Sequence, residues 1–234
     1  MVDLISALLA EFSGYEQCIS ITGSGGKTTA LIALAAAYAE TGKRVLVSTT
    51  TKLELPEQRA YGCDRYVFDG SVLEYRPLAG QRVFYALQGT HKALAPPIDE
   101  LQRLLQFYDV LLLEADGALH KQLKLHTERD PVVPYFTTAT LAVVGFGAMG
   151  KSLRQTCYGC ESLVDGTVDW QTYRMLLTHP QGITKNMKGK KVILCNEAQN
   201  TDASDIQALS HACADLPLWF GSLSTNALLQ RNKV

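Results

Sequence analysis

Apolar runs recur along the chain, and stretches in which apolar residues return every three or four positions lie between them. The longer runs predict six buried strands, at residues 18–21, 44–50, 109–117, 141–147, 191–197 and 216–221. Two shorter strands are expected at 66–68 and 82–86. Because strands alternate with helical stretches, the pattern favours an α/β fold: a three-layer, mostly parallel sheet with helices on both faces.

Helical spacing predicts five helices, at residues 1–14, 30–40, 98–108, 168–178 and 204–214. The first carries Asp3 and Glu11 and lacks a basic start, so we expect a short amphipathic helix and not a signal peptide. The region 117–138 contains Pro131 and Pro134 and few apolar pairs, which predicts a long ordered loop.

Residues 19–29 read ISITGSGGKTT, an apolar run that breaks into a glycine-rich turn before an alanine-rich helix. Glycines in this turn let the backbone direct its amides inward and approach an oxyanion closely. Lys27 adds a point charge for the β- and γ-phosphates of a nucleotide, and the hydroxyl of Thr28 suits Mg²⁺. The following helix directs its dipole at the same anion. The predicted phosphate-binding residues are Gly23, Ser24, Gly25, Gly26, Lys27, Thr28 and Thr29.

The glycine spacing is a variant of the common phosphate loop, which has a further glycine where this chain has Ile21. The spacing Gly23-x-x-Gly26-Lys27-Thr28 resembles the loop of Mur-type peptide ligases and of some other P-loop ATPases. The alternative is an ordinary strand-to-helix turn with an incidental lysine. The buried strand before the turn and the long helix after it favour the phosphate site, and with it a P-loop NTPase-like fold.

A second candidate element is the apolar strand that ends in Glu114-Ala115-Asp116-Gly117. An acid at the end of a buried strand is the Walker B arrangement, in which a carboxylate holds Mg²⁺ directly or through water. We expect Thr28 and Glu114 to hold the metal and Asp116 to orient water or a substrate hydroxyl. The alternative is that both acids only mark the polar end of a strand.

A third candidate element is the segment from Thr49 to Lys52, which follows the second predicted strand. Ligands of open α/β sheets bind at the carboxyl ends of the strands. Thr50 and Thr51 are therefore predicted to contact the nucleotide, and Lys52 to act on water or an acceptor. The alternative is that the threonines only favour the strand and that Lys52 is solvated.

Composition limits the classes of function. Apolar residues make up 47% and charged residues 19% of the chain, which is typical of a soluble globular protein. The net charge of −1 provides no general attraction to nucleic acid or anionic lipid, and the longest apolar run is too short to span a bilayer. We expect a cytoplasmic protein without nucleic-acid or membrane partners, whose six cysteines stay mostly reduced.

The segments ITGSGGKTT, VSTTTKL and LLEADGA, followed by DPVVP, VVGFGAMGKSL and THPQGITK, resemble in this order the YqeC-type proteins. These are accessory proteins of selenium-dependent molybdenum hydroxylases. The resemblance implies a nucleotide-binding P-loop domain that acts in the maturation of a selenium-containing molybdenum site. It also implies a molybdenum hydroxylase, or the precursor of its cofactor, as a partner.

The chain departs from the YqeC pattern in two segments. Cys157-Tyr158-Gly159-Cys160-Glu161 stands where members tend to have His-Arg-Pro-Glu, and Asn196-Glu197-Ala198-Gln199 stands where they tend to have Asn-Lys-x-Asp. The aspartate of the latter motif pairs with the guanine edge through two hydrogen bonds, which Gln199 cannot both accept. ATP is therefore expected in preference to GTP.

The spacing of Cys157 and Cys160 fits a redox dithiol or half of a zinc site, but no second such pair accompanies it. Two ordinary loop thiols are the alternative. The residues from Gly145 to Gly150 match the dinucleotide fingerprint GxGxxG, yet the segment after them is a poor helix, and we expect them to shape a loop near the second substrate.

The region 117–138 contains His120, Lys121, Lys124 and His126, side chains that could bind an anionic substrate. None of the five histidines of the chain has metal-ligand spacing such as HxxxH. A solvated loop is the expected environment for these four residues.

The leading hypothesis is one α/β domain over residues 1–234 that binds ATP (or GTP) with Mg²⁺ and hydrolyses or transfers the γ-phosphate. Lys27, Lys52 and Asp116 are its predicted catalytic residues. Three alternatives remain open: a nucleotide-gated carrier module without turnover of its own, a Mur-like small-molecule ligase or kinase, and dinucleotide binding at Gly145.

Overall fold

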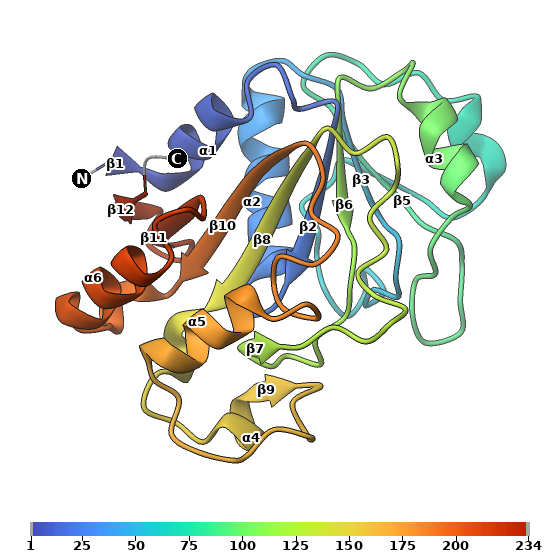
Figure 1. Cartoon of the computed structure of the whole chain (residues 1–234). Coiled ribbons are helices and arrows are strands. Elements are labelled where there is room, and N and C mark those ends of the chain that lie inside the picture. Colours follow the sequence, from blue (N-terminus) through green and yellow to red (C-terminus); the bar gives the residue numbers. More distant parts are fainter. Residues whose placement is uncertain (1, 233–234) are drawn as a thin grey trace.

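A ten-stranded sheet runs through the molecule and carries helices on both faces (Figure 1). The computed structural model describes residues 2–232. In order across the sheet, the strands are β1 (Val2–Asp3), β12 (Ala227–Arg231), β11 (Leu218–Ser222), β10 (Lys190–Asn196), β8 (Ala139–Gly145), β2 (Cys18–Gly23), β6 (Val110–Glu114), β3 (Val45–Thr49), β5 (Arg82–Tyr85) and β4 (Arg65–Val67). Neighbouring strands are parallel except where β12 pairs with β11 and with β1. This confirms the predicted three-layer, mostly parallel α/β sheet of the P-loop NTPase-like class.

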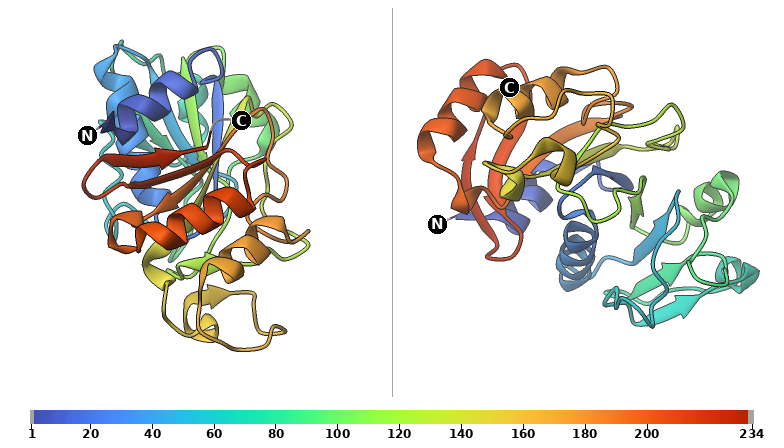
Figure 2. Two further views of the ribbon diagram at one scale, coloured as in Figure 1. Left: turned by 60° about the vertical axis from the view of Figure 1, so that its left-hand side comes forward. Right: turned by 90° about the horizontal axis from the view of Figure 1, so that it is seen from below.

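Two layers of helices cover the sheet (Figure 2). One face carries α1 (Leu4–Glu11) and α2 (Lys27–Glu40), and the other carries α3 (Ile98–Leu104), α5 (Trp170–Thr178) and α6 (Ala203–Ala212). None of the helices within residues 2–232 is both long enough and apolar enough to cross a membrane.

Strand β6 shows why the apolar pattern identifies the buried strands. Leu112 packs into the core under α2, whereas Leu111 and Leu113 pack into the core under α3. A strand that is covered on both faces is apolar at every position instead of alternating with polar residues. The continuous run from Val110 to Leu113 follows from this burial.

Several short elements complete the fold. They are η1 (Gly70–Leu73), η2 (Phe146–Ala148), η3 (Ala198–Asn200), α4 (Leu153–Thr156), β7 (Leu123–Lys124) and β9 (Cys157–Tyr158). Strands β7 and β9 form a separate parallel pair below the main sheet in Figure 1. The region 117–138 is irregular apart from β7.

All eight predicted strands and all five predicted helices are present, with bounds that differ by a few residues. The predicted helix over 1–14 is α1, and residue 1 lies outside the described residues. Strands β1, β7, β9 and β12 and the single-turn helix α4 were not predicted. Three of these strands have two residues each, too few for a periodic pattern.

The order of the central strands brings the candidate residues to one edge of the sheet. Strand β2 lies between β8 and β6, and the chain passes through α2 to β3 on the far side of β6. The parallel strands end at the same edge, so Gly23, Glu114, Thr49 and Asn196 lie at the position where ligands of open α/β sheets bind.

Candidate functional site

The turn between β2 and α2 forms the centre of the candidate site. Gly23, Gly25 and Gly26 have φ angles of +92°, +72° and +138°, which residues with side chains rarely adopt. A Cβ atom at Gly26 would lie 2.6 Å from Nδ2 of Asn196. Glycine is therefore required in this turn both by the backbone angles and by the approach of a neighbouring side chain.

The turn leaves a run of backbone amides without partners. The amide of Gly23 donates to Oδ2 of Asp116 at 3.1 Å, and the amide of Ser24 donates to the carbonyl of Val143 at 2.8 Å. Across residues 2–232, no hydrogen-bond acceptor serves the next five amides, from Gly25 to Thr29. Unpaired donors at the N-terminus of a 14-residue helix form a nest that suits an anion.

Lys27 is held at the base of this nest by two carboxylates. Its Nζ donates to the carbonyl of Gly23 at 2.9 Å and lies 3.4 Å from Oδ1 of Asp116 and 3.9 Å from Oε1 of Glu114. The side chain is only 6% exposed. A buried ammonium beside unpaired amides concentrates positive potential at the turn.

Thr28 and Glu114, the predicted metal pair, are in direct contact. The hydroxyl of Thr28 donates to Oε2 of Glu114 at 2.8 Å. Burial raises the pKa of Glu114, and the charge of Lys27 and the bond from Thr28 oppose that rise. A hydroxyl beside a buried carboxylate is a set of hard oxygen donors that fits Mg²⁺, and a cation there would favour the ionised acid.

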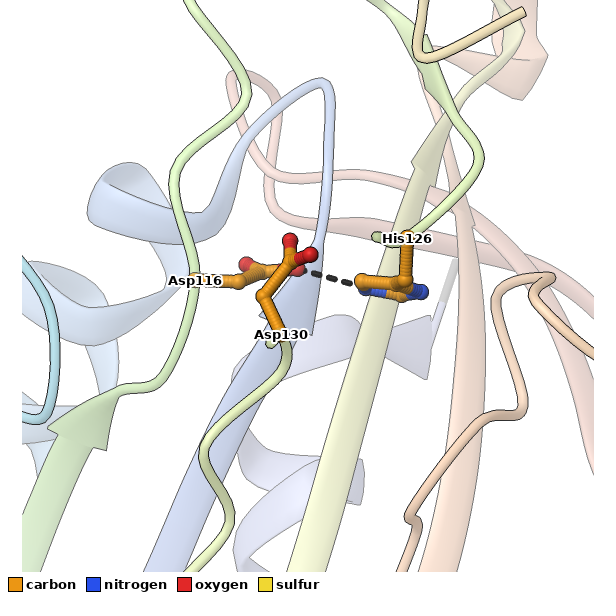
Figure 3. Close-up of side chains that lie close together, drawn as sticks. All are labelled: Asp116, His126 and Asp130. Carbon is orange, nitrogen blue, oxygen red and sulfur yellow. Dashed lines mark hydrogen bonds and ion pairs between the residues drawn. The ribbon is translucent and has the colours of Figure 1, made fainter. Parts of the chain in front are cut away.

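Asp116 lies behind the turn and contacts several donors. Its Oδ2 is 3.1 Å from Nζ of Lys124 and 2.6 Å from Nε2 of His126, in addition to the amide of Gly23. Burial by itself would raise the pKa of Asp116, but Lys27, His126 and Lys124 outweigh burial, and the pKa falls to about 2. Figure 3 shows the contact between this carboxylate and the imidazole ring.

The expectation that Lys124 and His126 belong to a solvated loop is wrong, because both side chains are buried. Lys124 forms a second ion pair with Asp130, and Nδ1 of His126 lies 2.9 Å from the carbonyl of Gly182. The ionised carboxylate of Asp116 needs charged or hydrogen-bonding partners in a site without water, and these two residues provide them.

Asp116, His126 and Asp130 also have the spacing of a metal centre. One ligand atom from each lies within 4.8 Å of the others (Figure 3). The ammonium of Lys124, however, contacts both carboxylates and occupies the position that a cation would take. We therefore interpret this cluster as an internal ion-pair network.

A cavity of about 910 Å³ opens in front of the turn. Its volume is in the range of small-molecule sites. The predicted residues that line it are Gly25, Gly26, Lys27, Thr28, Thr29, Thr50, Thr51, Lys52 and Glu114. Gly23, Ser24 and Asp116 do not line it: the amide of Gly23 donates to Asp116, and the hydroxyl of Ser24 donates to the carbonyl of Gln122.

The threonine segment after β3 is tied to the end of β6. The hydroxyl of Thr49 and the amide of Thr50 both donate to the carbonyl of Glu114, at 2.8 and 3.0 Å. The hydroxyl of Thr50 donates to the carbonyl of Val132 at 2.7 Å. Thr51 and Lys52 follow directly and line the cavity, and the side chain of Lys52 is exposed.

Asn196 stabilises the glycine-rich turn through hydrogen bonds, a role that was not predicted from the sequence. Its Nδ2 donates to the carbonyl of Gly25 at 2.8 Å, and its Oδ1 accepts from the amide of Leu223 at 2.9 Å. Glu197 lines the cavity, whereas Gln199 is exposed and does not. The signal available in the sequence was the position of Asn196 at the end of a buried strand.

The GxGxxG segment has a structural role. Gly145 packs against the turn, since a Cβ atom there would lie 3.1 Å from Cα of Gly25. The chain continues into η2 and then the four-residue α4, not into the longer helix that a dinucleotide site requires.

The structure joins Cys157 and Cys160 in a disulfide, so the expectation of reduced cysteines does not hold for this pair. The other four cysteines, Cys18, Cys63, Cys195 and Cys213, are free. Cys157 begins β9, which pairs with the strand that carries Lys124.

Comparison with known proteins agrees with the resemblance of the motifs. The family model for the YqeC protein matches residues 19–161. A protein of Escherichia coli (strain K12) with the name "Uncharacterized protein YqeC" is 29% identical over 198 residues, which cover 78% of this chain and 76% of that protein. The matched region contains the glycine-rich turn, the threonine segment, Glu114 and the Asp116 network. Because the family model covers more than half of the residues, the chain belongs to the YqeC family.

Proposed function

We propose that this protein binds a nucleoside triphosphate, ATP or GTP, with Mg²⁺ in the cavity and hydrolyses or transfers its γ-phosphate. The observation that carries the proposal is the run of unpaired amides from Gly25 to Thr29, which opens with Lys27 onto a cavity of about 910 Å³. Such a run is the recognition element for the phosphates of a nucleotide.

The chain's own residues have separable roles in this proposal. The amides of the turn and the ammonium of Lys27 bind the phosphates and stabilise negative charge that develops during transfer. Thr28 and Glu114 would hold Mg²⁺, which supplies further neutralisation of phosphate charge when bound. Thr50, Thr51 and Lys52 line the same cavity. In this proposal the two threonines would contact the nucleotide, and Lys52 would act on water or an acceptor.

Asp116 acts in this proposal as a positioning residue. It accepts from the amide of Gly23 and pairs with Lys27, so it fixes the base of the turn instead of facing a ligand. This differs from the role predicted for it as a group that acts on water.

A carrier module without turnover of its own is the second candidate function. The burial of Asp116 favours it, because the acid expected to orient water does not reach the cavity. Single-turnover hydrolysis with and without a molybdenum hydroxylase distinguishes the two: an enzyme turns over alone, and a carrier requires the partner.

The proposed biological role rests on the family resemblance of the motifs. We propose that nucleotide binding serves the maturation of a selenium-dependent molybdenum hydroxylase, with that enzyme or its cofactor precursor as the partner. Loss of selenium from a hydroxylase produced in cells that lack this chain would support the role, and full selenium occupancy would contradict it.

Thermal denaturation with ATP, GTP and Mg²⁺ tests the nucleotide site. A ligand at 100 times its Kd stabilises the folded state by about 2.7 kcal/mol, which raises Tm by several degrees. We expect this rise in the wild type and in Lys191→Ala, whose side chain is exposed near the amino end of β10, on the opposite edge of the sheet. Lys27→Ala should lose it, and an unchanged rise in Lys27→Ala would contradict the proposal.

A further inference from the structure

The cavity extends to both sides of the glycine-rich turn, and the two sides differ. Asn196 and Leu223, from the ends of β10 and β11, line one side. The segment after β3 lines the other side. Glu114 lies at the end of β6, between β2 and β3, so the proposed metal pair faces the β3 side, and a phosphate bound to that metal would face it too.

The register of two neighbouring segments decides which side chains face this part of the cavity. Leu53 and Ala93 form an antiparallel bridge with two backbone hydrogen bonds of 3.0 Å, and both side chains are buried in the core under α2. Side chains alternate between faces in extended backbone, so the flanking Lys52, Glu54 and Lys92 lie on the opposite face. All three line the cavity.

Positive charge dominates this part of the cavity. Lys52, Arg59 and Lys92 line it together with two acids, Glu54 and Glu114, and Glu114 is already engaged by Thr28 and Lys27. Glu54 is already shared between Arg59, at 3.8 Å, and the ring of His120, at 3.6 Å. Within the part of the chain that the structure describes, Lys52 and Lys92 have no ion-pair or hydrogen-bond partner. A cleft lined by one sign of charge attracts ligands of the opposite sign.

Apolar groups lie next to these cations. Leu94, Ala95 and Tyr61 line the same region, and Leu119 is 74% exposed at its edge. Leu119 and His120 have φ angles of +45° and +59°, a conformation that costs energy for residues other than glycine and that clusters at ligand sites. An adjoining hollow of about 790 Å³ shares Lys52, Lys92 and Leu94, so there is room beyond the nucleotide.

We propose that this basic part of the cavity, defined by Lys52, Arg59 and Lys92, binds the carboxylate or phosphate group of a small second substrate with an apolar body. In the proposed complex, the site lies beside the terminal phosphate of the nucleotide. It would hold the molecule that accepts this phosphate. This inference rests on the proposed function, and it favours the ligase or kinase form of that function over simple hydrolysis.

Isothermal titration of the nucleotide-loaded protein tests the pocket. The protein is saturated with Mg²⁺ and a non-hydrolysable ATP analogue, and inorganic phosphate and succinate are titrated in separate arms. We expect one anion site. The anion that binds more tightly, inorganic phosphate or succinate, shows whether the pocket prefers a phosphate or a carboxylate. Lys92→Glu should weaken anion binding about tenfold, because it replaces an exposed attracting charge with a repelling one, and Lys92→Ala should weaken it less. Lys191→Ala serves as the matched control and should bind as the wild type does.

The affinity for the nucleotide analogue separates the other outcomes. It should be unchanged in Lys92→Ala, and a parallel loss of analogue and anion binding would assign Lys92 to the phosphates of the nucleotide and overturn the pocket. Absence of anion binding in the loaded wild type would overturn it as well. If the wild type binds no nucleotide, the proposed function fails. The same anions are then titrated into two proteins, the single variant Lys27→Ala and the double variant Lys27→Ala/Lys92→Glu. Equal anion affinities in those two proteins would then overturn the pocket separately.

Discussion

Among the described residues, Asp116 contacts more charged or ionisable side chains than any residue that lines the cavity. One buried carboxylate pairs with the cations of Lys27 and Lys124, contacts the ring of His126 and accepts from the amide of Gly23. The charges are mutually compensating, because each cation would be costly in this environment without the acid. The turn therefore depends on a residue that lies outside the cavity.

Asp116→Asn should destabilise the folded protein by about 3 kcal/mol, because it removes one of the two carboxylates with which each buried lysine, Lys27 and Lys124, is paired. The free energy of unfolding from urea denaturation measures the effect. Glu128→Gln, at an exposed position of the same region, should change that free energy by less than about 0.5 kcal/mol. A loss for Asp116→Asn as small as that of the control would contradict the proposed network.

Gly23→Ala should destabilise the protein more than Gly42→Ala, although both glycines have similar φ angles, +92° and +82°. A Cβ atom at Gly23 would lie 2.1 Å from the carbonyl oxygen of Val143, whereas nothing lies within 4 Å at Gly42. We expect a loss of roughly 3 kcal/mol or more for Gly23→Ala and about 1 kcal/mol for Gly42→Ala. Equal losses of unfolding free energy in urea denaturation would mean that backbone strain, and not the contact with Val143 of β8, requires glycine at position 23.

Individual side chains of the candidate site could be predicted from the sequence only in part. Glycine spacing and the acid at the end of an apolar strand indicate Lys27, Thr28 and Glu114, because their chemistry is local in the sequence. Lys124 and His126 are buried through contacts with Asp116 and the carbonyl of Gly182, and no local pattern encodes such contacts. A cation within a polar loop is solvated by default, so burial could not be inferred.

At the scale of elements, long apolar strands were predictable because both of their faces are buried. Strand β12 was not predicted, since four of its five residues are partly or fully exposed and its position depends on pairing with β11 and β1. Asn196 illustrates the same limit in the site. Its place at the end of β10 is evident, but its bonds to Gly25 and Leu223 depend on the order of strands in the sheet.

Strands β3 and β6 are joined at their amino ends by Arg44 and Asp109. Both the side chain and the amide of Arg44 donate to the carboxylate of Asp109. These bonds hold the pKa of Asp109 at about 2, below its usual 3.8. The lowered pKa means that the ionised acid stabilises the folded state above about pH 4 and that this contribution is lost as the pH falls toward 2.

The difference in unfolding free energy between the wild type and Asp109→Asn should therefore shrink between pH 4 and pH 2. Because both side chains are more than a third exposed, we expect the difference to be below about 1 kcal/mol at neutral pH. Urea denaturation of both proteins at several pH values measures it. A difference that grows in acid would show that the ion pair does not stabilise the fold.

At the scale of the whole molecule, the six cysteines divide into one bonded pair and four free thiols. A thiol reagent applied to the unfolded, unreduced chain should therefore modify four cysteines, and six after reduction. Peptide mapping should place the protected pair at Cys157 and Cys160. Modification of all six without reduction would show that these two are thiols in the isolated protein.

The pairing of β12 with β1 brings together segments that are far apart along the chain, as the hydrogen bond between Ile5 and Asn226, 221 positions apart, shows. Synthesis on the ribosome proceeds from the first segment to the last, so α1 emerges long before the strand that fixes it exists. The part of α1 that packs against β12 must stay exposed or find temporary cover until that strand is made, whereas α2, its other neighbour, follows α1 early. The edge of the sheet then closes as a late, slow step, as expected for contacts of large sequence separation.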